Sequence, residues 1–223
     1  MTPDILPVST PEPEPLRFPR GVRFPHPDEI PRGGPPTRAL PPAPPQITTG
    51  YRVATAEGRP YSALIEANVH ADRVWHTVQA LSRALLPSAA APIVGIGGED
   101  PVLGPYTDRE VALAVFEPYV DALQHDGFLE FGIIFQYQGR TEEVFVRAAK
   151  YVQVWTNRPE TARRILEECG VPPVPDLQFI DEFPRVSESL CDSAGNAGWP
   201  PVLDGLRAAF ATLPQRRPPP SVT

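Results

Sequence analysis

Five acidic side chains between residues 110 and 130 are the first candidates for a functional surface. Glu110, Glu117 and Asp121 are spaced i, i+7 and i+11, so they share one face of a predicted helix. Asp126 and Glu130 follow just past the predicted end of that helix. Such a row of carboxylates is either a solvated face opposite the core or an electrostatic docking surface for a partner protein. The sequence leaves both interpretations open.

The charge of the chain favours a protein partner over a nucleic acid. The formal net charge is −7, and residues 51–200 alone carry −9, because 21 acidic side chains outnumber 12 basic ones there. A body this acidic repels phosphate backbones, so we expect no binding to nucleic acid. The same charge suits a basic partner, although it also serves solubility alone.

A glycine loop with nearby carboxylates is the best candidate for an enzyme site. Gly95–Gly98 follows a predicted strand, but no Gly-Lys-Ser/Thr comes after it, and the third glycine of a dinucleotide fingerprint is missing. Glu99 and Asp100 would repel a phosphate there, so a flexible strand exit is the simpler interpretation. An enzyme would have to use the carboxylates around Glu99, Asp100 and Asp108.

Metal binding and nucleophilic catalysis have no recognisable motif in the chain. His70 and His76 are six residues apart, not the four of a helical metal pair, and no Cys-x-x-Cys exists. A Gly-x-Ser-x-Gly elbow is also missing. Glu167 and Glu168 should raise the pKa of the Cys169 thiol and make it a poor nucleophile. We therefore expect no metal and no cofactor.

Lys150 is the only lysine among 20 basic residues. On neighbouring strands it can pair across the ladder with Glu142 or Glu143, and we expect this ion pair in preference to a catalytic role.

The composition favours a soluble cytoplasmic protein. Cys169 and Cys191 set no disulfide framework, which is typical of a reducing compartment. The first residues show neither the basic nor the apolar region of a secretory signal. No apolar run approaches the length that spans a bilayer, so we expect no membrane association.

Residues 1–47 are predicted to be a proline-rich arm, extended or disordered. Fifteen of the 32 prolines fall between Pro3 and Pro45, where they remove backbone donors and favour polyproline II. Four apolar side chains are too sparse for a core but frequent enough to act as anchors: Leu16, Phe18, Phe24 and Ile30. We expect part of Leu16–Ile30 to dock on the chain's own domain or on a partner, and a passive tail is the alternative.

Residues 48–190 are predicted to form one α+β domain. Alternation and turn signals predict strands at 51–56, 61–67, 92–96, 131–137, 142–147 and 151–155, with a further edge strand at 177–183. Helical spacing predicts three helices: from Val74 to before Pro87, from a Thr107/Glu110 capping box to Gly127 with a kink or fresh turn at Pro118, and from an Asn157 N-cap to Cys169.

The predicted order is ββ-α-β-α-ββ-α-β followed by a C-terminal helix. This order favours a mostly antiparallel sheet with helices packed on one face. Residues 191–200 are expected to be a linker, 201–214 an amphipathic C-terminal helix, and 215–223 a disordered tail.

The stretch from Phe131 to Pro184 resembles small immunity-type proteins of bacterial polymorphic toxin systems. The resemblance rests on three runs that cover about a quarter of the chain: Glu142–Val146, Lys150–Asn157 and Asp181–Pro184. It implies a cytoplasmic protein that binds and neutralises a toxin domain. A scaffold protein that docks through its proline-rich arm, and an enzyme with an unrecognised carboxylate site, are the alternatives.

Overall fold

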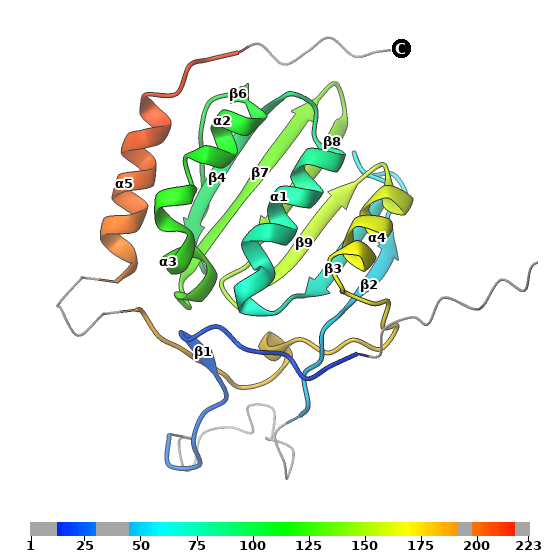
Figure 1. Cartoon of the computed structure of the whole chain (residues 1–223), viewed down its shortest axis with the longest axis vertical. Helices are drawn as coiled ribbons and strands as arrows, with labels where there is room; N and C mark the ends of the chain where they lie inside the picture. The colour runs from blue at the N-terminus through cyan, green and yellow to red at the C-terminus, as the bar shows by residue number, and fades with distance from the viewer. Residues whose placement is uncertain (1–12, 30–44, 191–197, 217–223) are drawn as a thin grey trace, which may run out of the picture.

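An eight-stranded antiparallel sheet forms the centre of the molecule (Figure 1). The computed structural model describes residues 13–29, 45–190 and 198–216. The strand order is β2-β3-β9-β8-β7-β4-β5, and β6 pairs with the start of β4. The strands are Gly50–Thr55 (β2), Ala63–Asn68 (β3), Ala89–Ile96 (β4), Val102–Leu103 (β5), Thr107–Asp108 (β6), Leu129–Tyr137 (β7), Arg140–Val146 (β8) and Tyr151–Thr156 (β9).

The predicted strands between residues 131 and 155 form a three-stranded meander. Gln138 and Gly139 join β7 to β8 with φ angles of 47° and 74°. A two-residue hairpin turn of this kind needs two left-handed residues, which glycine adopts without strain. The register sets Phe131 opposite Val146 and so places both on the face that packs under the helices.

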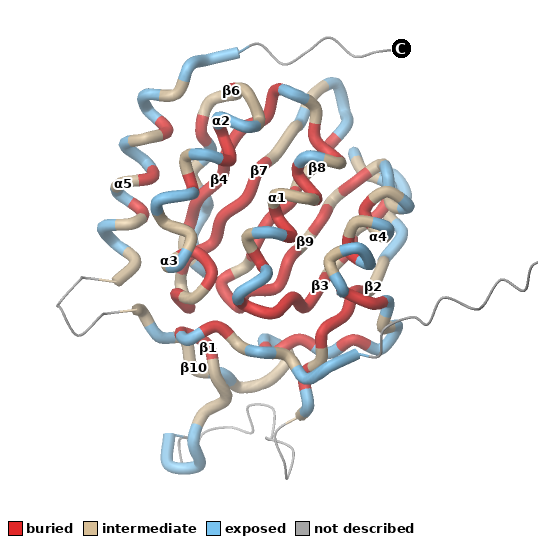
Figure 2. Tube along the Cα trace, in the orientation of Figure 1, coloured by how far each residue is buried: buried red, intermediate tan, exposed pale blue. Residues whose placement is uncertain are grey.

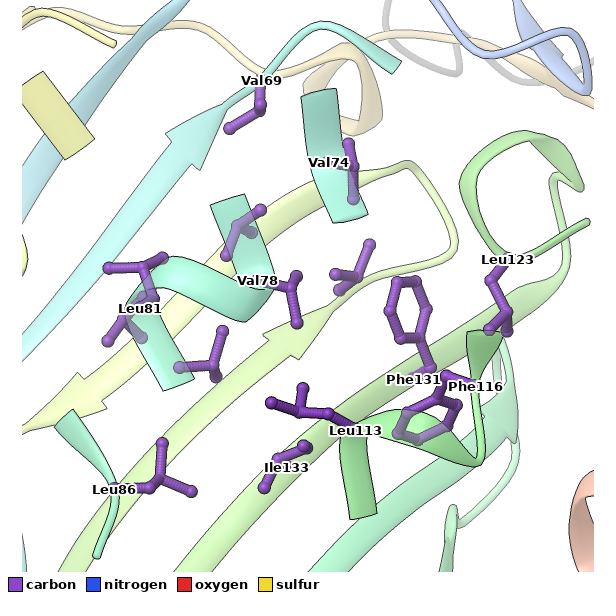
Figure 3. Close-up of a cluster of buried hydrophobic side chains, with 14 of the residues drawn as sticks. Val69, Val74, Val78, Leu81, Leu86, Leu113, Phe116, Leu123, Phe131 and Ile133 are labelled. Atoms are coloured by element: carbon purple, nitrogen blue, oxygen red, sulfur yellow. The ribbon is translucent and has the colours of Figure 1, made fainter. Parts of the chain in front are cut away.

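The helices cover one face of the sheet, which confirms the predicted α+β class (Figure 1). They are Val74–Leu85 (α1), Arg109–Ala114 (α2), Val120–His125 (α3), Pro159–Glu168 (α4) and Trp199–Ala211 (α5). The predicted apolar face of α1 is at most 1% exposed at each of its residues, Val74, Val78, Leu81 and Leu85. Figure 3 shows this face in one cluster with Phe131 and Ile133 of β7.

The second predicted helix is split, as its internal proline suggested. α2 ends at Ala114, and Pro118 lies in a 3₁₀ turn, Glu117–Tyr119, from which α3 starts. The predicted capping box at Thr107 is wrong. Thr107 belongs to β6, and Asp108 is the N-cap, because its carboxylate accepts from the Glu110 N–H at 3.0 Å.

The fourth helix also begins differently from the prediction. Asn157 is not its N-cap, because α4 starts at Pro159 after Arg158. The Asn157 amide instead donates to the carbonyls of Pro60 and Thr141, at 3.2 Å each, and so joins the β2–β3 turn to β8. Gly170, with a φ of 79°, ends the helix as predicted.

The segment after α4 departs furthest from the predicted elements. Residues 177–183 do not form an edge strand, because Ile180–Glu182 is a 3₁₀ turn whose apolar residues pack into a second small core. The strand lies later, at Val186–Ser187 (β10), and pairs with Val22–Arg23 (β1) of the arm. α5 runs from Trp199 to Ala211, so it begins within the predicted linker 191–200 and ends before the predicted bound of 214. Residues 191–197 and 217–223 lie outside the described residues.

Residues 13–29 of the predicted arm are extended and dock on the chain's own domain. Leu16 donates its N–H to the Ile47 carbonyl, and Gly21 donates to the His125 carbonyl, both at 2.8 Å. Val22 is 1% exposed and shares the second core with Phe18 and Phe24. Figure 2 shows this part of the arm, partly buried, along the lower end of the sheet. The predicted anchors Phe18 and Phe24 therefore pack against the domain, Leu16 bonds through its backbone to Ile47 at the end of the predicted arm, and Ile30 lies outside the described residues.

The arm is further fixed by a histidine. His70 is 3% exposed and accepts the Arg17 N–H through Nδ1 at 3.1 Å. Its Nε2 then carries the proton and donates to the Glu14 carboxylate, an interaction that lowers the pKa of Glu14.

Candidate protein-binding surface

The five predicted acidic residues do not form one surface. Glu117 and Asp121 are exposed, and Asp121 pairs with Arg20 of the docked arm at 2.5 Å. Glu110 is exposed as well, but Arg83 and Arg109 pair with it at 3.0 Å each. The prediction is wrong for the other two, because Asp126 is 1% and Glu130 3% exposed.

Asp126 and Glu130 instead belong to a buried polar network at the end of the sheet. Asp126 accepts the Phe128 N–H at 2.9 Å, the Leu190 N–H at 2.9 Å and the Ser189 hydroxyl at 3.1 Å. Glu130 accepts the Ala148 N–H at 3.0 Å. Each carboxylate thus orders a turn from within and is too buried for a partner protein to contact.

Lys150 completes this network, which corrects its predicted pairing with Glu142 or Glu143. Its φ of 65° turns the chain before β9, and its amine donates to the Leu129 carbonyl. The residue is 2% exposed, and burial lowers the pKa of its amine to about 7, against the opposing effect of Asp126 and Glu130.

Glu142 has other partners. It accepts the Thr156 hydroxyl at 2.6 Å and the Asn157 N–H at 3.1 Å. This buried carboxylate therefore fixes the end of β9 and the approach to α4.

The carboxylates of the enzyme hypothesis are not brought together. Glu99 and Asp100 are exposed on the loop after β4, whereas Asp108 pairs with residues at the opposite end of that strand. A recess of about 190 Å³ does border Gly97 and Gly98, but its carboxylates are Glu130 and Asp181. Among the residues that the structure describes, no group of three or more His, Cys, Asp or Glu side chains could hold a metal ion.

Cys169 has the predicted raised pKa, but for a different main reason. Burial is the largest cause, and the neighbouring Glu168 adds to it. Thr77 and Arg73 oppose the shift without reversing it, and a thiol held in its protonated form is a poor nucleophile.

A surface that the sequence analysis missed lies on the helix-free side of the sheet. Successive side chains of a strand point to opposite faces of the sheet. Every second strand residue therefore points away from the helix-covered core and onto this side. Leu64, Trp155 and Ile134 are half-buried, and Leu103 is 56% exposed. None of them belongs to the core beneath the helices.

The strand register brings these side chains side by side. Leu64 lies opposite Trp155, Trp155 opposite Glu143, and Glu143 opposite Ile134. In the next row, Phe145 lies opposite Gly132, Gly132 opposite Ile93, and Ile93 opposite Leu103. Ile93 and Phe145 are buried, at 4% and 3% exposed. We call the accessible members of the set the sheet-face patch: Leu64, Leu103, Ile134, Glu143 and Trp155.

Glu143 lies in the middle of the sheet-face patch. Within the described chain it has no hydrogen-bond or ion-pair partner, and burial raises the pKa of its carboxyl to about 7. The Arg147 guanidinium opposes this shift only in part, because it lies over the Phe145 ring, 5.8 Å from the centroid, and pairs with Glu130 at 3.5 Å. A half-buried carboxyl among apolar side chains costs free energy until a hydrogen-bond donor pairs with it.

A sequence signal for this surface existed. Ile134 and Trp155 are apolar in the phase of their strands that a one-sided sheet leaves in water. Strands that are apolar in both phases indicate that both faces are covered or that the second face binds something.

Comparison of the chain with protein-family models, with curated proteins and with solved structures gave no match. In the described part of the chain, no helix has the length and apolar character needed to cross a membrane.

Proposed function

We propose that this chain is a protein-binding module that engages a basic partner through the sheet-face patch. The observation that carries the proposal is Glu143, a carboxyl at the centre of an apolar sheet face that makes no salt bridge to any described residue. A partner that places a lysine or arginine beside it and apolar groups over Trp155 would satisfy both features at once. Trp and charged groups in desolvated pockets are the usual hot spots of protein interfaces.

The charge of the chain supports the same kind of partner. Residues 51–200 carry −9, so a basic protein would be attracted over a distance and would associate faster at low salt. The predicted acidic residues Glu117 and Asp121 remain exposed and contribute to this field, although they lie on the helix side.

The resemblance to immunity-type proteins supports a more specific proposal, that the partner is a basic toxin domain. Its residues include Glu143 and Trp155, which supply the centre of the sheet-face patch. Neutralisation would follow if the partner's active residues lie beneath this patch in the complex.

The proposal is tested by capture with matched variants. The wild-type chain, W155S and V111S are immobilised and exposed to an extract of the native cells at two salt concentrations. Val111 is 38% exposed on α2, so V111S removes an apolar side chain away from the patch. We expect a basic protein that the wild type and V111S retain, that W155S loses, and whose retention falls with salt.

A second arm separates toxin neutralisation from binding alone. The captured protein is expressed in a bacterial host with and without the chain. Toxicity that the wild-type chain relieves and W155S does not relieve supports neutralisation. A harmless captured protein removes the toxin hypothesis, and equal capture by wild type and W155S removes the sheet-face patch as the interface.

A further inference from the structure

The exposed edge of the sheet carries a groove that is separate from the sheet-face patch. It has a volume of about 580 Å³ and runs along β2, the outermost strand. Tyr51 and Val53 line one side of it, Glu160, Arg163 and Glu167 of α4 line the other, and Val174 closes one end.

The chain itself shows how this edge binds a strand. Tyr51 donates its N–H to the Pro172 carbonyl at 2.9 Å and accepts the Val174 N–H at 2.8 Å, so residues 172–174 form a short parallel partner for β2. The Tyr51 hydroxyl donates to Glu167 at 2.7 Å and so holds the helix wall in place. One end of the edge is therefore already occupied by an extended segment of the protein.

The rest of the edge is free among the described residues. In an antiparallel pair, every second residue directs both its N–H and its carbonyl away from the neighbouring strand. Tyr51, which pairs with Ala67, points both groups outward, so Val53 and Thr55 do the same. Their backbone groups extend the row that Tyr51 begins.

The internal segment cannot extend along this edge. Residues 173 and 175 are prolines, which lack an N–H, and the Leu177 N–H turns the chain back to the Val174 carbonyl. β2 itself has neither a proline nor an inward charge at Val53 or Thr55. Proteins usually protect such an edge, because it pairs readily with other chains.

We propose that the groove binds an extended peptide segment of a partner protein, which adds as a strand beside Val53 and Thr55. The segment would alternate apolar and polar residues. Val53 faces the helix-covered side of the sheet, so an apolar side chain of the peptide would lie beside it, and the next would point to solvent. The mixed charges of α4, Glu160 and Arg163 among them, form the rim that its polar ends would contact.

The test uses fluorescent ten-residue peptides in which valine or threonine alternates with serine or lysine, and the same compositions in scrambled order. Binding is followed by fluorescence anisotropy up to millimolar peptide. We expect binding of the alternating peptides, with scrambled ones at least about tenfold weaker. Hydrogen exchange adds a direct readout: the Val53 and Thr55 amides should exchange fast in the free protein, unlike the Tyr51 amide, and slow on addition of peptide.

Matched variants at Val53 locate the site. V53P removes the outward N–H without breaking a bond to β3, whereas V53T keeps it. We expect V53P to lose binding by about tenfold or more and V53T to bind within about twofold of the wild type, with unchanged unfolding midpoints. W155S should bind the peptides normally, because the sheet-face patch lies on the other side.

The proposal is overturned if no alternating peptide binds at millimolar concentration, or if V53P binds as well as V53T. Either result would leave the capture experiment with W155S unaffected. Loss of binding in W155S together with retention in V53P would place the peptides on the sheet-face patch and likewise overturn the groove.

Discussion

Lys150 should make the protein more stable as the pH rises above neutrality. Burial lowers the pKa of its amine to about 7, whereas the unfolded chain keeps the ordinary value of 10.5. Between these values the unfolded chain binds one more proton than the folded chain, so raising the pH favours folding. The full cost of burying the ammonium is present below pH 7 and is gone above pH 10.5. The expected gain between pH 7 and pH 9 is about 2–3 kcal/mol.

Urea unfolding of the wild type, K150M and K150R at pH 7, 8 and 9 measures this gain. Subtracting the K150M curve removes the titration of all other groups that the two proteins share. K150R keeps a charge that does not titrate in this range, so it should lack the slope while retaining a cation beside Asp126 and Glu130. Wild-type and K150M stabilities that run parallel within about 0.5 kcal/mol from pH 7 to 9 would refute the reasoning.

Three further predictions follow from single contacts. Burial raises the pKa of Glu143 from 4.5 to about 7, so the folded chain binds a proton more tightly than the unfolded chain. In the same urea assay, the unfolding free energy of the wild type should therefore fall by about 1–3 kcal/mol relative to E143Q as the pH rises from 4.5 past 7. G21A places a Cβ 2.5 Å from the Glu188 oxygen and 2.7 Å from the His125 oxygen that accepts the Gly21 N–H, so trypsin should cleave at Arg20 and Arg23 faster than in the wild type. Gly139 has a φ of 74° and open space around it, so G139A should lower the unfolding free energy by about 1 kcal/mol through the backbone alone and leave cleavage of the arm unchanged.

The sequence predicted the sheet and helices wherever apolar periodicity extended over several turns or strand residues. α1 is an example, because Val74, Val78 and Leu81 repeat at helical spacing and all three are fully buried. The caps were less predictable. Asp108 and Thr107 are both good N-cap residues, and pairing of Thr107 with Ala90 of β4 decides between them. That pairing depends on residues far apart in the chain, which local pattern does not contain.

The docking site of the arm and the buried polar network were also unpredictable from local sequence patterns, because both depend on contacts between distant segments. Asp126 and Glu130 look like surface residues in sequence, yet Ser189 and Ala148 close over them from distant segments. The apolar spacing of Phe18 and Phe24 indicated docking, but only the fold shows that Phe179 and its neighbours provide the pocket. Whether these polar side chains are buried depends on which turns meet at the end of the sheet, and amino-acid composition does not predict that.

The two proposed surfaces share one physical origin, because the helices leave one face and one edge of the sheet uncovered. Five helices lie on one face, where strand residues such as Ile133 and Val154 are fully buried. The intervening residues Ile134 and Trp155 are apolar as well, although no described helix remains to cover them. Folding alone gives no reason to keep apolar side chains, or an acid with a raised pKa, on a wet sheet face, since both lower stability there. A free strand edge beside Val53 has the same character. Features that reduce the stability of the isolated chain are explained most simply if it acts in complex with another protein.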